Sequence, residues 1–164
     1  MVRQRWSILA GLTALLIGVA SCATSSDLAD DDLLDVLAVT VTGEEFSGME
    51  LVGQPVVLWF WTPWCTVCRS EAPGIADIEA QFGDSVQFVG VAAQGPTEDM
   101  VTFINQTGVG GFTHLDDRSA DVWGHFGVVS QPSYVFISPD GTAERLVGTL
   151  SKSALTDRIQ RLIG

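Results

Sequence analysis

Residues 56–68 read VVLWFWTPWCTVC, and this stretch decides the fold. Its first six residues are all apolar, as expected of a strand that is buried on both faces. After Pro63, the cysteines Cys65 and Cys68 stand three residues apart at the predicted start of a helix. Helix residues at this spacing share one face, so the two sulfurs can form a disulfide with little backbone movement. Free N–H groups at a helix start favour a thiolate on Cys65, the species that attacks disulfides.

Predicted strands and helices alternate on both sides of this stretch. Hydrophobic patterning predicts strands or short strand segments over residues 36–42, 46–51, 56–61, 86–92, 112–115, 134–137 and 143–150. It predicts helices over residues 65–82, 97–107, 120–126 and 151–163. This order predicts an α/β fold in which helices flank a mixed central β-sheet, with an N-terminal strand or hairpin as an extension.

The first 21 residues are typical of an export signal of the lipoprotein type. Two basic residues, Arg3 and Arg5, precede a mostly apolar run over 6–20 that is short for a membrane span. The run ends in VASC at 19–22, which resembles the bacterial lipobox and predicts lipidation of Cys22. Ordinary cleavage near residues 20–23 and an uncleaved anchor are the alternatives. Each of the three places the domain outside the cytoplasm, where a disulfide can persist.

Residues 22–35 form a predicted acidic tether, and residues 36–164 a single domain. The tether contains five aspartates and no basic residue, which favours an extended linker, although its last residues also fit an acidic first helical turn. The chain has a formal net charge of −12, and loss of residues 1–21 makes it −14. Such a balance argues against nucleic acid as a partner, since phosphate binding needs clustered Lys and Arg.

Two motifs resemble the TlpA-like thioredoxin proteins, a family that includes the exported DsbE-like oxidoreductases of actinobacteria. Residues 56–73 resemble the active-site segment of that family, including the Arg-x-Glu-x-Pro pattern over 69–73. Residues 126–133, FGVVSQPS, are similar to its cis-proline loop, and Gln131 before Pro132 resembles the exported actinobacterial branch. The resemblance extends from Leu37 to the C-terminus and implies a thioredoxin fold.

The resemblance also implies roles for individual residues. Cys65 is then the attacking cysteine, and Cys68 resolves the mixed disulfide. Pro132, in the cis form, lies against the dithiol, with Gln131 before it in the substrate-binding loop, while Trp64 offers an apolar contact surface. No bound cofactor and no metal are implied, because the electrons move through the two sulfurs.

The expected activity is thiol–disulfide exchange outside the cytoplasm with cysteines of exported proteins. A membrane partner must reset the site: either a quinone-linked oxidase of the vitamin K epoxide reductase kind or a transmembrane thiol reductase. The dipeptide Thr66-Val67 has neither the His of strongly oxidising relatives nor the Gly-Pro of reducing thioredoxins. The direction of transfer therefore stays open, and we favour oxidation of the client.

Besides the Thr66-Val67 dipeptide, one more residue departs from the pattern of the family. Trp59 stands where cytoplasmic thioredoxins carry a buried aspartate that moves protons, so Glu79 or another acid would have to serve. Arg69 and Glu71 are interpreted as an exposed ion pair on the first helical turns.

Several alternatives remain open at this point. The cysteine pair also fits a structural disulfide or, because Thr62 precedes Cys65 by three residues, a peroxidatic site, although Leu58 replaces the proline of that pattern. Zinc needs four ligands, and beyond the cysteine pair only His114 and His125 remain, eleven residues apart and off any zinc-finger spacing. A reductase for cytochrome c maturation and a non-catalytic peptide-binding module are the alternative functions.

Overall fold

The computed structural model describes residues 33–164. The predicted signal peptide over 1–21, the predicted lipidation site Cys22 and the predicted tether up to residue 32 lie outside the described residues. Within the described part of the chain, no helix has the length and apolar character needed to span a membrane.

A five-stranded sheet with the order β5-β4-β3-β6-β7 forms the centre of the molecule. The central strand, β3 (Val56–Trp61), runs parallel to β4 (Gln87–Ala92) and antiparallel to β6 (Ser133–Ile137). The edge strands are β5 (Thr113–Asp116), parallel to β4, and β7 (Ala143–Val147), antiparallel to β6. All six residues of β3 are buried. The mixed sheet and the doubly buried strand of the sequence prediction are thus confirmed.

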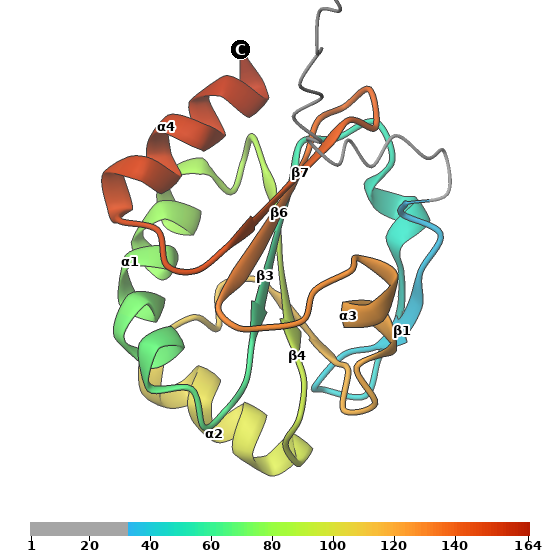
Figure 1. Ribbon diagram of the computed structural model, residues 1–164, viewed down its shortest axis with the longest axis vertical. Coiled ribbons are helices and arrows are strands. Elements are labelled where there is room, and N and C mark those ends of the chain that lie inside the picture. Colours follow the sequence, from blue (N-terminus) through green and yellow to red (C-terminus); the bar gives the residue numbers. More distant parts are fainter. Residues whose placement is uncertain (1–32) are drawn as a thin grey trace, which may run out of the picture.

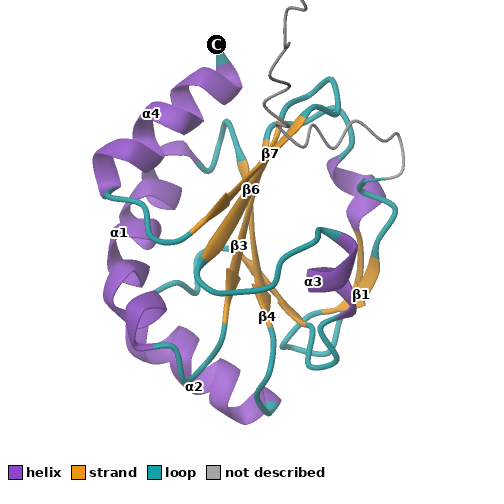
Figure 2. Cartoon of the chain, viewed as in Figure 1, coloured by secondary structure: helices purple, strands orange, loops and turns teal. Residues whose placement is uncertain are grey.

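Helices cover one face of the sheet and a smaller layer covers the other (Figures 1 and 2). The first face carries α1 (Thr66–Phe82), α2 (Thr97–Thr107) and α4 (Lys152–Ile163). The second carries α3 (Asp121–His125) and the N-terminal extension, made of β1 (Leu37–Val39), β2 (Glu45–Ser47) and the 3₁₀ helix η1 (Gly48–Leu51). Because β1 and β2 pair antiparallel, the extension is the predicted hairpin.

Alternation along β3 divides the core between the two faces. Trp59 and Trp61 point toward the helical face, where the Trp61 ring stacks on Phe103 of α2 with centroids 4.2 Å apart. Phe60 points the other way and meets Trp123 of α3 edge to face, at 6.0 Å. Both tryptophans of β3 are fully buried, which confirms their interpretation as core residues.

The register of the sheet brings five loops to one of its ends, one of them being residues 117–120, which follow β5 where Asp116 pairs with Ala92. Trp61 pairs with Ala92, so the loops that follow β3 and β4 leave the sheet together. Phe60 pairs with Ser133 and Ser133 with Val147, which places the loop before β6 and the loop after β7 at the same end. We call the other four loops the loop edge. It consists of residues 62–65, 93–96, 127–132 and 148–151.

Candidate redox site

Cys65 is the N-cap residue of α1 and not its first helical residue. Its backbone is extended, with φ −72° and ψ 107°, and its carbonyl accepts the N–H of Arg69. Its Sγ accepts the backbone N–H of Cys68 at 3.0 Å, which is the hydrogen bond that a capping side chain normally makes. The strand-to-helix junction therefore holds this sulfur at the positive end of a 17-residue helix.

Cys65 and Cys68 form a disulfide with their Cα atoms 5.3 Å apart. Cys65 retains 7% of its surface in contact with solvent, whereas Cys68 has none. An incoming thiolate can thus reach the Cys65 sulfur only, because the second sulfur lies beneath the first helical turn.

A cis peptide bond joins Gln131 and Pro132, as the resemblance to the cis-proline loop implies. Pro132 is buried and Gln131 is partly exposed. The loop is fixed on both sides, since Ser133 Oγ donates to the Ser130 carbonyl at 2.7 Å and the Gly148 N–H donates to the Pro132 carbonyl at 2.8 Å. Because Ser133 pairs with β3 one residue before its end, Pro132 lies beside the loop that carries Cys65.

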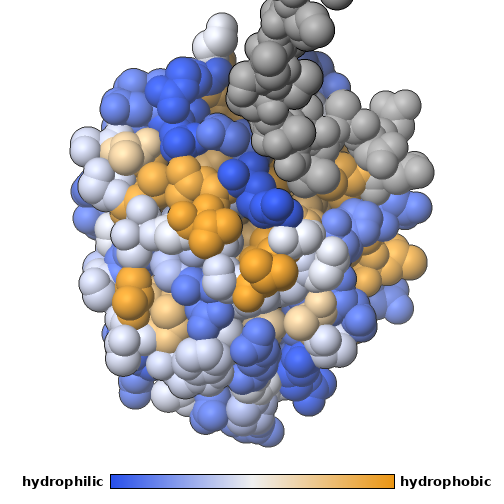
Figure 3. Space-filling view, in the orientation of Figure 1, coloured by the Kyte–Doolittle hydropathy of each residue, from blue (hydrophilic) through white to orange (hydrophobic). Residues whose placement is uncertain are grey.

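Three apolar side chains are exposed around the disulfide. Trp64 is 59% exposed, Val67 in the first turn of α1 is 47% exposed, and Val129 in the cis-proline loop is 88% exposed. Figure 3 shows the surface toward the viewer, with small apolar patches set among hydrophilic residues. The loop edge contains no Asp, Glu, Lys or Arg, although the chain carries 20 acidic and 8 basic residues. The four loops themselves are therefore uncharged in a strongly acidic protein, and the charged groups that contact them are Arg69, which donates to the Pro63 carbonyl at 3.4 Å, and Arg145, which donates to the Gly127 carbonyl at 2.7 Å.

Glu71 is an acid in this region that the sequence analysis interpreted wrongly. It does not pair with Arg69, which donates to Gln106 Oε1 at 2.9 Å and lies over the ring of Phe103. Instead, Glu71 Oε1 accepts the indole N–H of Trp59 at 2.9 Å. The exposed ion pair is absent because α1 turns Glu71 toward the sheet, on the same face as Cys68, one turn earlier.

Burial raises the pKa of Glu71 above its usual value. Contacts with the Trp59 indole, the Tyr134 hydroxyl and the main chain of Leu150 oppose this shift without cancelling it. Burial and the nearby Glu71 carboxylate likewise raise the pKa of Tyr134. Trp59, which replaces the buried aspartate of cytoplasmic thioredoxins, thus holds a carboxyl group that α1 supplies. The spacing of three residues from Cys68 was the available sequence signal.

Glu79, which the sequence analysis considered as a proton carrier, lies elsewhere. It follows Cys68 by eleven residues on α1, a rise of roughly 16 Å along the helix axis. Its carboxylate lies against Gly83 and Gly111, far from the loop edge. The two histidines are also occupied elsewhere. His114 is buried, with its Nε2 2.7 Å from the Val109 carbonyl, and His125 Nε2 lies 2.9 Å from the Leu33 carbonyl.

A disulfide between an N-cap cysteine and a buried cysteine one turn later, beside a cis-proline, defines a thiol–disulfide oxidoreductase with a thioredoxin fold. Residues 29–145 match the AhpC/TSA family, and the chain belongs to that family. Its match to soluble secreted antigen MPT53 of Mycobacterium tuberculosis has 35% identity over 151 residues, covering 90% of this chain and 85% of the antigen.

Solved structures agree with this assignment. The structure of DsbF from MTB is 41% identical, has a TM-score of 0.77, and is aligned over 79% of this chain and 96% of its own. A secreted Mycobacterium tuberculosis disulfide oxidoreductase, described as homologous to DsbE of E. coli, is 35% identical with a TM-score of 0.77. It is aligned over 81% of this chain and 100% of its own. This protein is therefore a thiol–disulfide oxidoreductase of the DsbE and MPT53 type.

The raised pKa of Glu71 predicts a specific dependence of stability on pH. Between the unfolded pKa, 4.5, and the raised folded pKa, the folded chain binds more protons than the unfolded chain. The free energy of unfolding therefore falls as the pH rises through this range. We expect Glu71→Gln to remove this loss, because the amide has no proton to release and its oxygen still accepts the Trp59 N–H.

The measurement is denaturant unfolding of both chains at pH 4 and pH 7. Glu71→Gln should gain stability over the unsubstituted chain at pH 7 and show little difference at pH 4. Glu79→Gln is the matched control on the same helix. Equal pH dependence in the unsubstituted chain and Glu71→Gln would contradict the assignment of a buried, protonatable carboxyl at this position.

Proposed function

We propose that this protein exchanges disulfides with cysteines of exported proteins outside the cytoplasm. The observation that carries the proposal is the asymmetry of the cysteine pair, with a reachable Cys65 sulfur at a helix N-terminus and a fully buried Cys68. The secreted relatives support the location. In this proposal Cys65 and Cys68 are the catalytic residues, and Trp64, Gln131 and Pro132 contact the client.

The exchange proceeds in two balanced steps. A client thiolate attacks Cys65 Sγ, which forms a mixed disulfide and breaks the bond to Cys68, so Cys68 leaves as a thiolate. A second client thiolate then attacks the client sulfur of the mixed disulfide and releases the Cys65 thiolate. The client loses two electrons and gains a disulfide, and the protein becomes a dithiol after taking up two protons. Reduction of a client is the same sequence in reverse.

Glu71 is the proton carrier for Cys68 in this proposal. Cys68 has no contact with solvent, so the proton that it gains or loses must travel through the protein. Glu71 follows it by one helical turn, and its raised pKa keeps the carboxyl protonatable closer to neutral pH than an exposed glutamate. The carboxyl group thus supplies a proton when Cys68 leaves and accepts one when Cys68 attacks.

The client segment fits the uncharged loop edge. Trp64, Val67 and Val129 offer apolar surface around Cys65, and none of the four loops contributes a charge that a neutral segment would have to desolvate. We infer that client cysteines are flanked by uncharged, partly apolar residues in an extended or unfolded segment. Acidic flanks are disfavoured by the net charge of −12, and salt weakens this effect.

A trapping experiment tests the two cysteine roles. When the Cys65 thiolate attacks a client disulfide, Cys68 is the group that resolves the resulting mixed disulfide. In Cys68→Ala the Cys65 sulfur should therefore remain covalently joined to client proteins in the producing cell. The adducts should appear on non-reducing gels and vanish with dithiothreitol. Cys65→Ser is the control, which should give none and abolish exchange. Exchange that persists in Cys65→Ser would contradict the proposal.

We favour disulfide donation as the direction of transfer. The hydrogen bond from the Cys68 N–H and the helix N-terminus stabilise a Cys65 thiolate, which favours the reduced protein and makes its disulfide oxidising. Equilibration in glutathione buffers should therefore give a reduction potential toward about −180 to −120 mV. A value near about −270 mV would instead assign reduction of clients. A quinone-linked membrane oxidase would reset the site in the first case, and a transmembrane thiol reductase in the second.

The proposed location is the outer face of the cytoplasmic membrane, through lipidation of Cys22. The support is the VASC sequence at 19–22 and the acidic residues that follow it. Cys22→Ser should move the protein from the membrane fraction to the medium, whereas Cys65→Ser, which also removes one thiol, should leave it at the membrane. Release of the unsubstituted chain into the medium would contradict a lipid anchor and indicate a secreted protein.

A further inference from the structure

We propose that the loop between β4 and α2, residues 93–96, is a latch that fixes Trp64 in the orientation in which it contacts the client. The loop and its anchor, Thr97, then act as positioning elements for the redox site. This inference rests on the proposed role of Trp64 as a client contact. It concerns residues that take no part in the exchange of sulfur bonds.

The latch acts on Trp64 through one hydrogen bond, which joins two residues that are 30 positions apart in the sequence. The indole N–H of Trp64 donates to the main-chain carbonyl of Gln94 at 2.9 Å. The Trp64 side chain is 59% exposed, and this bond is its polar contact among the described residues. A large exposed side chain would otherwise sample several rotamers. The bond therefore selects one orientation of the ring beside Cys65.

The backbone of the loop is specialised to present this carbonyl. Gln94 has φ 56°, a left-handed conformation that a residue with a side chain rarely adopts. Gln94 is exposed, so side-chain packing does not impose this conformation. Strain of this kind persists only where the surroundings hold it, and it concentrates at functional sites. Here it turns the Gln94 carbonyl toward the indole of Trp64.

Gly95 allows the loop to approach the segment that precedes Cys65. A Cβ atom at this position would lie 2.4 Å from Cγ of Pro63. Pro63 directly precedes Trp64, so the loop touches the active-site segment at two consecutive residues, once by packing and once by a hydrogen bond. A side chain at position 95 would force the two segments apart.

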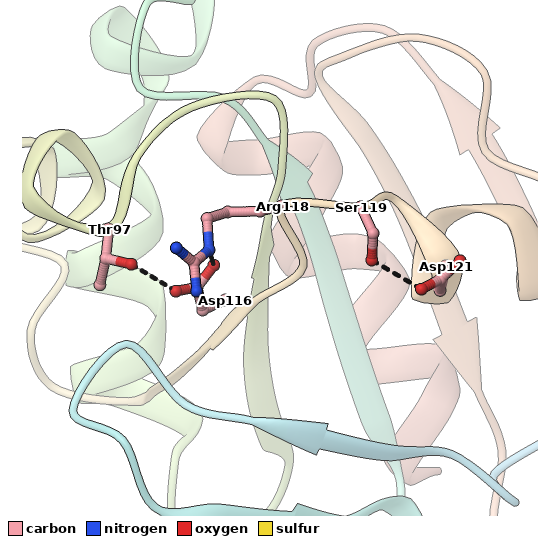
Figure 4. Close-up of polar contacts among 5 residues, drawn as sticks. All are labelled: Thr97, Asp116, Arg118, Ser119 and Asp121. Atoms are coloured by element: carbon pink, nitrogen blue, oxygen red, sulfur yellow. Dashed lines mark hydrogen bonds and ion pairs between the residues drawn. The ribbon is translucent and has the colours of Figure 1, made fainter.

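A buried acid anchors the far end of the loop (Figure 4). Thr97, the first residue of α2, donates from Oγ1 to Asp116 Oδ2 at 2.5 Å. Asp116 also pairs through Oδ1 with Arg118 Nε at 2.9 Å, and its side chain is 7% exposed. At the near end, the Ala93 N–H donates to the Trp61 carbonyl at 3.1 Å. The loop is thus tied to β3 on one side and to β5 on the other.

This arrangement matters for binding more than for folding. A hydrogen bond to an exposed indole contributes little to global stability, but a ring that is already ordered loses little rotamer freedom when a client binds. The latch therefore acts on the reaction with a polypeptide, which contacts the ring, and has little effect on the reaction with a small thiol, which needs only the Cys65 sulfur.

The test compares variants of the loop in the purified whole chain. Thr97→Val removes the anchor, and Gly95→Ala separates the loop from Pro63. Gly74→Ala on α1 is the matched control, because a Cβ there meets nothing within 4 Å. The oxidised proteins react with reduced, unfolded ribonuclease A as a protein client and, separately, with glutathione. A third readout is the indole N–H resonance of Trp64, which Trp64→Phe identifies by its disappearance.

We expect Thr97→Val and Gly95→Ala to shift the Trp64 resonance and speed its exchange with solvent. They should lower the rate with ribonuclease A by at least about threefold, with the glutathione rate within about twofold of the unsubstituted chain. In a double-mutant cycle, Thr97→Val should add little to Trp64→Phe, because the anchor acts through the indole. The proposal would be overturned if the effects of Thr97→Val and Trp64→Phe on the ribonuclease A rate were additive. It would also be overturned if the variants lost as much rate with glutathione as with ribonuclease A.

Two substitutions at residue 94 test the same proposal independently, so that it stays testable if Thr97→Val or Gly95→Ala fails to fold. Gln94→Gly retains the carbonyl and accepts a positive φ readily, so it should retain the ribonuclease A rate. Gln94→Val disfavours a positive φ, so it should lower the rate of the reaction with ribonuclease A. Equal rates in the two would overturn the inference. Failure of the unsubstituted chain to react with ribonuclease A, while it reacts with glutathione, would instead overturn the proposed protein client.

Discussion

The position of the redox site depends on a single constraint, which is that β3 is hydrogen-bonded on both sides and buried along its whole length. A strand held in this way has one register and cannot slip, because a shift of one residue would exchange Trp59 and Trp61 with Leu58 and Phe60 between the two faces. The four residues after Trp61 therefore leave the sheet at a fixed point. The position of the Cys65 sulfur is therefore fixed by the central strand of the sheet.

The same strand also links the core to the chemistry of the buried cysteine. Alternation points Trp59 toward α1, and its indole N–H holds the carboxyl of Glu71, one turn after Cys68. Tyr134, which pairs with Trp59 across β3 and β6, faces the same carboxyl. An acid that would be costly to bury alone is thus held by the indole of Trp59, with the Tyr134 hydroxyl nearby. The proton carrier of the proposal is built from sheet and helix together.

Local patterns in the sequence were sufficient for most of the fold. The six apolar residues of β3, the cysteine spacing and the Gln131-Pro132 motif each act over a few residues, and the sheet, the N-cap cysteine and the cis bond agree with them. The contacts that were missed join distant segments. Glu71 meets Trp59 across 12 residues and Trp64 meets Gln94 across 30, and periodicity carries no information about which polar atoms face each other after folding.

The distribution of charge on the surface follows from the position of the strand ends. Parallel strands end together, so the ends of β3 and β4 gather the loops that a client must touch, and these loops are uncharged. Asp116 at the end of β5 lies next to them but is neutralised by Arg118 and tied to Thr97. The remaining acids keep the molecule soluble and act on a client only at a distance, where salt screens them. A charge at the loop edge would have to be desolvated whenever a client binds. The charged residues that keep the protein soluble therefore lie on other parts of the surface than the loops that contact the client.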